Sequence, residues 1–152
     1  VREVPTQLRD FDTPKVKTYS LETVVAEKLD AILDLMEFSS RMKDYYDIYF
    51  LSVEFSFDGD RLRTALVNTF KNRERTYKKD DLLKVLAFSQ DTEMVRKWDA
   101  FLIKMKLPFI QFESAIAGIA TFLQPVWDSM YTERSIGLIW NPRDSKWMLT
   151  KS

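Results

Sequence analysis

The chain has 152 residues, with 23 Lys and Arg against 23 Asp and Glu, so its formal net charge is zero. It contains no Cys and no His, which excludes disulfides, Cys/His zinc sites, thiolate catalysis and Ser-His-Asp chemistry. A balanced charge disfavours a domain that binds a polyanion over its whole surface. No apolar run approaches the ~18 residues that a membrane span needs, so we expect a cytoplasmic protein without a membrane partner.

The zero net charge hides two segments of opposite sign. Residues 22–60 hold ten acidic residues against three basic ones, Lys28, Arg41 and Lys43, which gives a net charge of −7. Residues 61–84 hold eight basic residues against three acidic ones, a net charge of +5. Such an uneven distribution indicates charged sites that the total conceals.

The hydrophobic periodicity predicts a mainly α-helical domain. A first helix is expected to begin after Ser20, which can cap it. Further helices are expected over about 40–52, from Asp58 and Gly59 onward, from Asp91 or Thr92, and over about 111–130.

Three details of this pattern are less regular. Residues 80–89 are either a short helix or packed loop. Pro125 is expected to kink the last helix or to end it early. Residues 136–140 and 146–149 flank the turn sequence NPRDS and predict a small β-hairpin. We therefore expect a helical bundle with a small C-terminal hairpin.

Lys28 is expected at an unusual place in the first helix. It lies four residues after Val24 and four before Ile32, which puts it inside the apolar stripe. A lysine buried there without a partner would be unfavourable. Either its stem covers the edge of the core while the ammonium reaches water, or the ammonium lies at the bottom of a cleft and meets a phosphate or a carboxylate.

The second helix carries one charged stripe. Lys43, Asp44 and Asp47 share a sector of about 100° on an ideal helix, and apolar side chains occupy nearly all the rest. The stripe is either a solvated face with one weak ion pair between Lys43 and Asp47, or a site. If this helix packs antiparallel on the first, Asp44 and Lys28 converge, and a lysine oriented by an aspartate can bind phosphate.

Residues 71–79, KNRERTYKK, combine five basic residues with Tyr77. Such a run either contacts a nucleic-acid backbone or forms a solvated helix end. Asp58-Gly59-Asp60 has the letters of a DxD magnesium motif, but it opens a helix. The chain has only three Gly and no Gly-rich phosphate loop.

Residues 19–32, YSLETVVAEKLDAI, and residues 40–49, SRMKDYYDIY, resemble the third and fourth motifs of the AbiEii-type nucleotidyltransferase toxins. These toxins belong to abortive-infection, type IV toxin–antitoxin systems, which serve in phage defence. Residues 69–73, 97–102 and 122–126 resemble downstream helical segments of the family in the same order. The resemblance spans roughly residues 11–127.

The resemblance implies a nucleotidyltransferase fold of the polymerase-beta type. In the family, an N-terminal α/β half carries G-S-x-x-x-D-x-D, whose carboxylates bind Mg²⁺ and a nucleoside triphosphate. The helical C-terminal half supplies a Lys and an Asp to the same cleft. Lys28 and Asp44 match these two catalytic residues, while Arg41, Lys43 and Asp47 match neighbouring substrate-binding positions.

This chain departs from the family pattern because it contains no G-S-x-x-x-D-x-D. We therefore expect residues 1–19 to be an extended linker from an N-terminal α/β domain outside this sequence, and residues 20–152 to be the C-terminal helical domain. The 152 residues alone would then be inactive, with the Mg²⁺ ligands upstream. The expected partners are an NTP, an RNA or protein acceptor, a cognate antitoxin and the chain's own N-terminal domain.

Two other functions stay open. A non-catalytic helical module for protein interaction or regulation would expose an apolar surface and would have no convergent charges. A nucleic-acid binder would use the basic run 71–79 and would lose affinity steeply with salt, although the zero net charge argues against it.

Overall fold

The computed structural model describes residues 20–35, 41–132 and 134–149. In these ranges it contains six α-helices, one short 3₁₀ helix and a three-stranded antiparallel sheet, so the expected mainly α fold is confirmed. The helices are α2 (Leu21–Leu35), α3 (Met42–Glu54), α4 (Gly59–Asn72), α5 (Asp81–Leu86), α6 (Thr92–Lys104) and α7 (Phe112–Thr132). The strands are β1 (Phe57–Asp58), β2 (Leu138–Asn141) and β3 (Lys146–Leu149). The expected linker, residues 1–19, lies outside the described residues.

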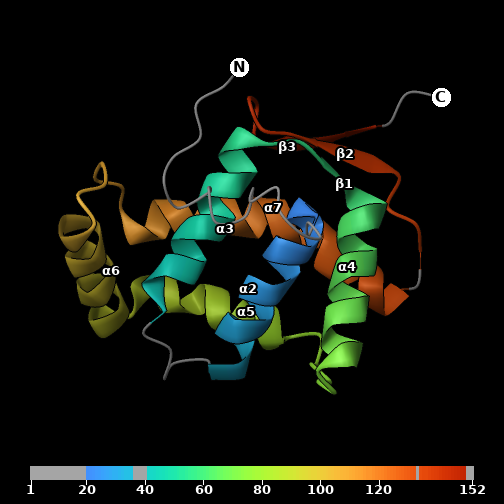
Figure 1. Cartoon of the computed structure of the whole chain (residues 1–152), viewed down its shortest axis with the longest axis horizontal. Coiled ribbons are helices and arrows are strands. Elements are labelled where there is room, and N and C mark those ends of the chain that lie inside the picture. The colour runs from blue at the N-terminus through green and yellow to red at the C-terminus, as the bar shows by residue number, and fades with distance from the viewer. Residues whose placement is uncertain (1–19, 36–40, 133, 150–152) are drawn as a thin grey trace, which may run out of the picture.

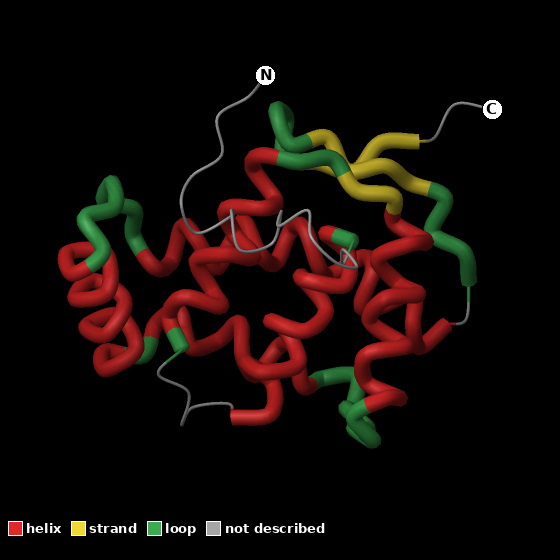
Figure 2. Tube along the Cα trace, viewed as in Figure 1, coloured by secondary structure: helices red, strands yellow, loops and turns green. Residues whose placement is uncertain are grey.

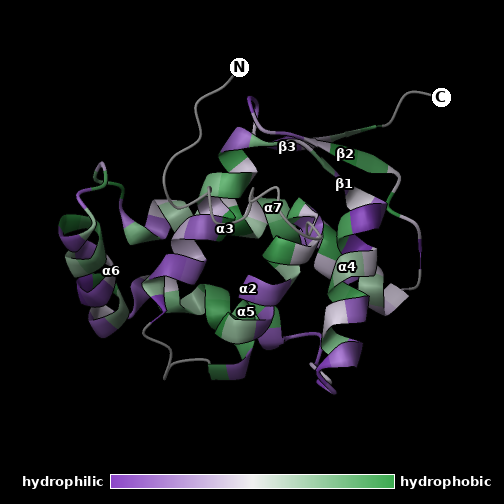
Figure 3. Cartoon of the chain, viewed as in Figure 1, coloured by the Kyte–Doolittle hydropathy of each residue, from purple (hydrophilic) through white to green (hydrophobic). Residues whose placement is uncertain are grey.

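Helix α2 lies between α3 and α4, and α7 crosses behind them (Figure 1). Apolar and polar residues alternate along these helices, so each can bury one face (Figure 3). The core takes its largest fully buried side chains from α6, α7 and β2, namely Trp98, Trp127 and Trp140. None of the helices in the described ranges is both long and apolar enough to cross a membrane.

The expected starts of α2 and α6 are confirmed by capping hydrogen bonds. Ser20 Oγ accepts the N–H of Thr23 at 3.1 Å at the start of α2, and Asp91 Oδ1 accepts the N–H of Met94 at 2.9 Å in α6. The ambiguous segment 80–89 contains α5, followed by the 3₁₀ helix Ala87–Gln90. The side-chain oxygens of Ser20 and Asp91 satisfy backbone N–H groups that a helix start leaves without a partner.

Of the two expectations for Pro125, a kink or an early end of the last helix, the early end is wrong, because α7 continues to Thr132. Proline removes one backbone hydrogen bond from a helix interior, which costs about 3 kcal/mol. The residues on both sides of it, Phe122, Leu123, Val126 and Trp127, are fully buried. Burying a large apolar side chain contributes roughly 1.5–3 kcal/mol, so packing outweighs the lost hydrogen bond.

The C-terminal hairpin is confirmed, and it pairs with a third strand that the sequence pattern did not indicate. Strand β2 pairs antiparallel with β3 and also with β1, whose Phe57 stands opposite Trp140. The sheet lies at one edge of the helical layer (Figure 2). Trp140 donates its indole N–H to the carbonyl of Ser52 in α3, and Trp147 donates to the carbonyl of Phe122 in α7. The hairpin is therefore fixed to two helices.

Asp58 and Asp60 act as structural groups at the start of α4, as expected for a motif that opens a helix. Asp58 Oδ1 accepts the N–H of Arg61 at 3.0 Å. Asp60 accepts the N–H of Ile136 at 2.8 Å and the N–H of Gly137 at 3.1 Å. Gly137 has φ +60°, which favours glycine. Asp60 thus holds the chain that leads into β2.

Asp60 makes the stability of this junction pH-dependent. Burial opposes its ionisation, but the N–H of Ile136, the hydroxyl of Ser135 and the N–H of Gly137 outweigh it, so the pKa of Asp60 lies below its usual value. A carboxylate with a lowered folded-state pKa stabilises the fold above its unfolded pKa and loses this effect as the pH falls through the folded value.

We therefore expect Asp60→Asn to lower the free energy of unfolding by about 1–2 kcal/mol at pH 7. The difference between the variant and the wild type should shrink as the pH falls below about 4. Urea unfolding at pH 7, 5 and 3 measures it. The same difference at all three pH values would contradict this role, and Asp144→Asn in the exposed hairpin turn is a matched control.

Candidate active site

Helices α2 and α3 bring Lys28 against the charged stripe of the second helix. Lys28 Nζ donates to Asp44 Oδ1 at 3.3 Å and lies 3.0 Å from Asp47 Oδ2. The expected convergence of Lys28 and Asp44 is therefore present. The neighbours of Lys28 in α2, Val24, Val25, Leu29 and Ile32, are buried, so the ammonium is held at the rim of the core.

Two further cations flank the carboxylates. Arg41 Nε lies 2.7 Å from Asp44 Oδ2, and Lys43 Nζ donates to Asp47 Oδ2 at 2.7 Å. Positive and negative charges thus alternate along Arg41, Asp44, Lys28, Asp47 and Lys43. We call these five residues the Lys28 cluster. It carries three positive and two negative formal charges.

Exposure separates the inner members of the Lys28 cluster from the outer ones. The side chains of Asp44 and Asp47 are 8% and 1% exposed, and that of Lys28 is 16% exposed. Arg41 and Lys43 are 56% and 44% exposed. An incoming anion would therefore reach the outer cations first and Lys28 afterwards. This places all five predicted site residues in one network.

The interior of the Lys28 cluster is not fully satisfied. Among the described residues, Asp47 Oδ1 and Tyr45 Oη are buried without a hydrogen-bond partner. Leaving a buried polar atom without a partner costs about 1–3 kcal/mol, and buried ion pairs often stabilise a fold no better than apolar residues do. The arrangement therefore favours a functional role over a purely stabilising one.

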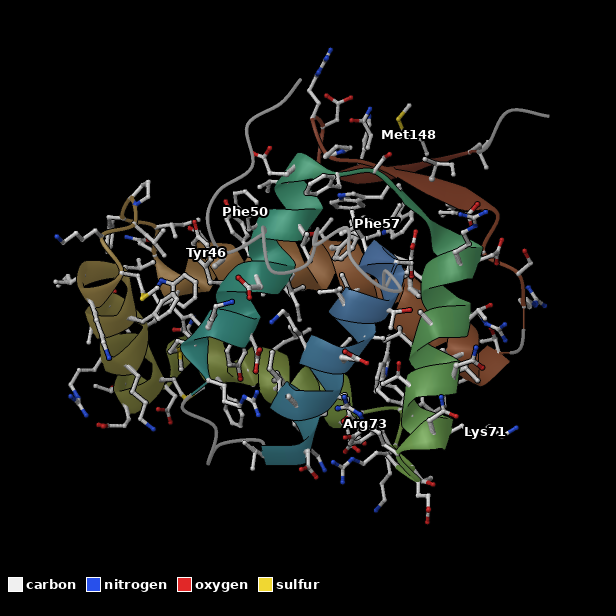
Figure 4. All side chains as sticks on the ribbon, in the orientation of Figure 1. Tyr46, Phe50, Phe57, Lys71, Arg73 and Met148 are labelled. Carbon is white, nitrogen blue, oxygen red and sulfur yellow. The ribbon has the colours of Figure 1, made fainter. Side chains whose placement is uncertain are left out.

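Two tyrosines of α3 border the carboxylates and stay neutral. Burial, and then the charge of Asp44, raises the pKa of Tyr45. Burial raises the pKa of Tyr46, with a further contribution from Asp47. Figure 4 shows Tyr46 and Phe50 on the side of α3 toward α6, where the ring of Tyr46 packs against Trp98. Neither phenol is suited to act as a base near neutral pH.

The Mg²⁺ that the resemblance implies finds no fitting site among the described residues. Mg²⁺ takes oxygen ligands in near-octahedral geometry. No group of three or more acidic side chains in residues 20–35, 41–132 and 134–149 is arranged so that it could hold a metal ion. Asp44 and Asp47 are already neutralised by Lys28, Arg41 and Lys43. We assign no catalytic step to a metal held by these residues.

A second buried carboxylate, Asp30, organises the basic run, although the sequence pattern did not single it out. Asp30 is 0% exposed. It accepts hydrogen bonds from Arg73 Nη1 at 2.8 Å and from the hydroxyl of Tyr77 at 2.8 Å, while Arg75 Nε lies 3.4 Å away. Figure 4 shows Arg73 beside the neighbouring ends of α2 and α4. These contacts tie the loop after α4 to α2.

The acidic side chains of α2 balance much of the positive charge of residues 71–79. Arg75 Nη1 lies 3.2 Å from Asp34 Oδ1, and Arg73 lies 3.9 Å from Glu27. Three lysines of the run, Lys71, Lys78 and Lys79, stay exposed. The structure therefore favours a loop anchored by its two arginines over an uncompensated basic patch for a nucleic-acid backbone.

The chain belongs to the AbiEii family. The model of that family, described as "Nucleotidyl transferase AbiEii toxin, Type IV TA system", matches residues 1–118. This range contains α2, α3 and the whole Lys28 cluster. The family is thus one of nucleotidyltransferase toxins in toxin–antitoxin systems. No curated protein and no solved structure matched the chain.

Proposed function

We propose that the Lys28 cluster is part of the nucleotide-binding cleft of a nucleotidyltransferase toxin. The single observation that carries the proposal is the convergence of Lys28 with Asp44 and Asp47 across α2 and α3. Membership of the AbiEii family supports it. A non-catalytic module would not require a lysine and two buried carboxylates to meet on one face.

The chemistry of nucleotidyl transfer suits this cluster. An acceptor forms a bond to the α-phosphorus of an NTP, the bond to the bridging oxygen breaks, and pyrophosphate leaves. Lys28 contacts the triphosphate oxygens and offsets the charge that develops on them. Asp44 orients Lys28, while Arg41 and Lys43 add outer phosphate contacts. Catalysis by these residues is mainly positioning and electrostatics.

Activity requires carboxylates that the described residues do not supply. The sequence has no G-S-x-x-x-D-x-D, and we propose that this motif lies in an N-terminal domain upstream of residue 1, with Mg²⁺ bound there. The acceptor is an RNA or a protein. The antitoxin implied by the type IV family and a role in phage defence in the cytoplasm belong to the same proposal.

Triphosphate binding to the 152-residue chain tests the cleft apart from the transfer step. Titration with each of the four NTPs at low salt, followed by amide NMR, should shift resonances around Lys28 and Asp44. Lys28→Ala should weaken this binding about tenfold or more, because one charge-assisted contact is worth about 1.5–3 kcal/mol. Lys71→Ala, outside the Lys28 cluster, is the control. Equal NTP affinity in wild type and Lys28→Ala would contradict the proposal.

A further inference from the structure

We propose that Asp47 is a positioning residue that holds the ammonium of Lys28 in place and does not itself touch the substrate. This inference rests on the proposed nucleotide-binding role of Lys28. The resemblance placed Asp47 among substrate-binding positions, but the geometry points to a different task. Asp47 Oδ2 lies 3.0 Å from Lys28 Nζ, closer than Asp44 Oδ1 at 3.3 Å.

Burial separates the roles of the two carboxylates. The side chain of Asp47 is 1% exposed, whereas that of Asp44 is 8% exposed and contacts Arg41, which is 56% exposed. A substrate phosphate can approach the cations without meeting Asp47. Repulsion between phosphate and carboxylate also disfavours direct contact with Asp47.

The spacing of the two carboxylates explains why both are needed. Asp44 and Asp47 are three residues apart in α3, so they lie on one helix face. The lysine ammonium is a compact charge on a flexible four-carbon stem. One anchor leaves that stem free to rotate, and the second anchor fixes the ammonium between two points. A charge placed in advance of substrate binding is the condition for electrostatic catalysis.

Lys43 shares the same oxygen of Asp47 but is less constrained. Lys43 Nζ lies 2.7 Å from Asp47 Oδ2, and its side chain is 44% exposed compared with 16% for Lys28. Solvent screens the outer pair more strongly than the inner pair. Asp47 Oδ2 therefore contacts both ammonium groups, with Lys28 on the buried side and Lys43 on the exposed side.

A double-mutant cycle of stability tests the contact without reference to activity. The cycle uses Lys28→Met, Asp47→Asn and the double variant in urea unfolding. In the wild-type background, Asp47→Asn should raise the unfolding equilibrium constant at least about tenfold more than in the Lys28→Met background. The reason is that Lys28→Met leaves two buried carboxylates facing each other, and Asp47→Asn relieves that repulsion.

One control and one alternative variant accompany this cycle. Asp30→Asn removes an equally buried carboxylate that contacts Arg73 and Arg75, so its effect should be the same in both backgrounds. If Asp47→Asn does not fold, Asp47→Glu keeps the charge and moves the carboxylate by one methylene. An equal effect of the Asp47 variant in both backgrounds would overturn the inference.

A kinetic cycle separates positioning from substrate contact. In the whole protein, with its upstream sequence, Asp47→Asn should slow nucleotidyl transfer about 10- to 100-fold. In the Lys28→Ala background it should change the rate less than about twofold. The same factor in both backgrounds would show that Asp47 acts independently of Lys28. A wild-type protein without transfer activity refutes the proposed function, and the stability cycle then decides alone whether Asp47 holds Lys28.

Discussion

Replacement of Lys28 by Ala should slow nucleotidyl transfer by the whole protein about 100- to 1,000-fold, the usual loss when one preorganised charge or donor is removed from a transition state. Lys28 is the innermost cation of its cluster and contacts both Asp44 and Asp47. Its loss also leaves two buried carboxylates that repel an incoming triphosphate. The measurement is the initial rate of label transfer from each α-labelled NTP to a mixture of cellular RNA and protein.

Conservative variants sharpen this prediction. Lys28→Arg keeps the charge but replaces a compact ammonium with a planar fork, so it should restore part of the rate. Lys43→Ala removes a cation that is 44% exposed and should cost less than Lys28→Ala. A transfer rate of Lys28→Ala within about threefold of the wild-type rate would show that Lys28 has no role in the active site.

The largest effect on stability is expected from Asp30→Asn. Breaking a buried ion pair typically lowers the free energy of unfolding by about 3–5 kcal/mol. Arg73 and Arg75 are 40% and 35% exposed, so solvent partly compensates them and we expect about 2–4 kcal/mol. The loop that carries Tyr77 should separate from α2 in the same variant. Urea unfolding and amide hydrogen exchange of residues 71–79 measure the two effects.

A nearby acid provides the control for Asp30. Asp34 lies one helical turn further along α2, contacts Arg75 and is 43% exposed. Asp34→Asn should therefore change the free energy of unfolding by less than about 1 kcal/mol. Equal losses of unfolding free energy in Asp30→Asn and Asp34→Asn would mean that the burial of Asp30 does not determine how much its ion pairs stabilise the fold.

The sequence was sufficient to predict the convergence of Lys28 and Asp44. Helical periodicity places Lys28 inside the apolar stripe of α2 and Asp44 in the only charged stripe of α3. A buried lysine and a buried aspartate on consecutive helices lower the free energy of the fold when they pair with each other. The pattern did not reveal that Asp47 would be more deeply buried than Asp44, because the burial of each carboxylate depends on how α2 packs against α3.

Asp30 shows where periodicity alone was not enough. It lies four residues after Ala26 and three before Leu33, the same kind of position that drew attention to Lys28. Its partners Arg73 and Tyr77 come from a loop more than 40 residues away, and loops have no period from which to place them. The acidic excess of residues 22–60 and the basic excess of residues 61–84 were the available signal.

The sequence did not indicate strand β1, and it left open whether the last helix ends at Pro125, for reasons of length and packing respectively. Strand β1 has two residues, which is too short for alternation to be recognised. It pairs with β2, a strand about 80 residues away in sequence, where Phe57 stands opposite Trp140. At Pro125, the local preference against proline in a helix was outweighed by the fully buried side chains around it.

We propose that Lys28 and Asp44 act as one unit in catalysis, and the transfer rate of the double variant tests this most directly. Rates of the whole protein are compared for wild type, Lys28→Ala, Asp44→Ala and Lys28→Ala/Asp44→Ala. We expect the double variant to be no more than about threefold slower than the slower single variant, because residues that act together lose their effects together. Wild-type rates in both single variants, or a double variant whose loss is the product of the two single losses, would contradict it.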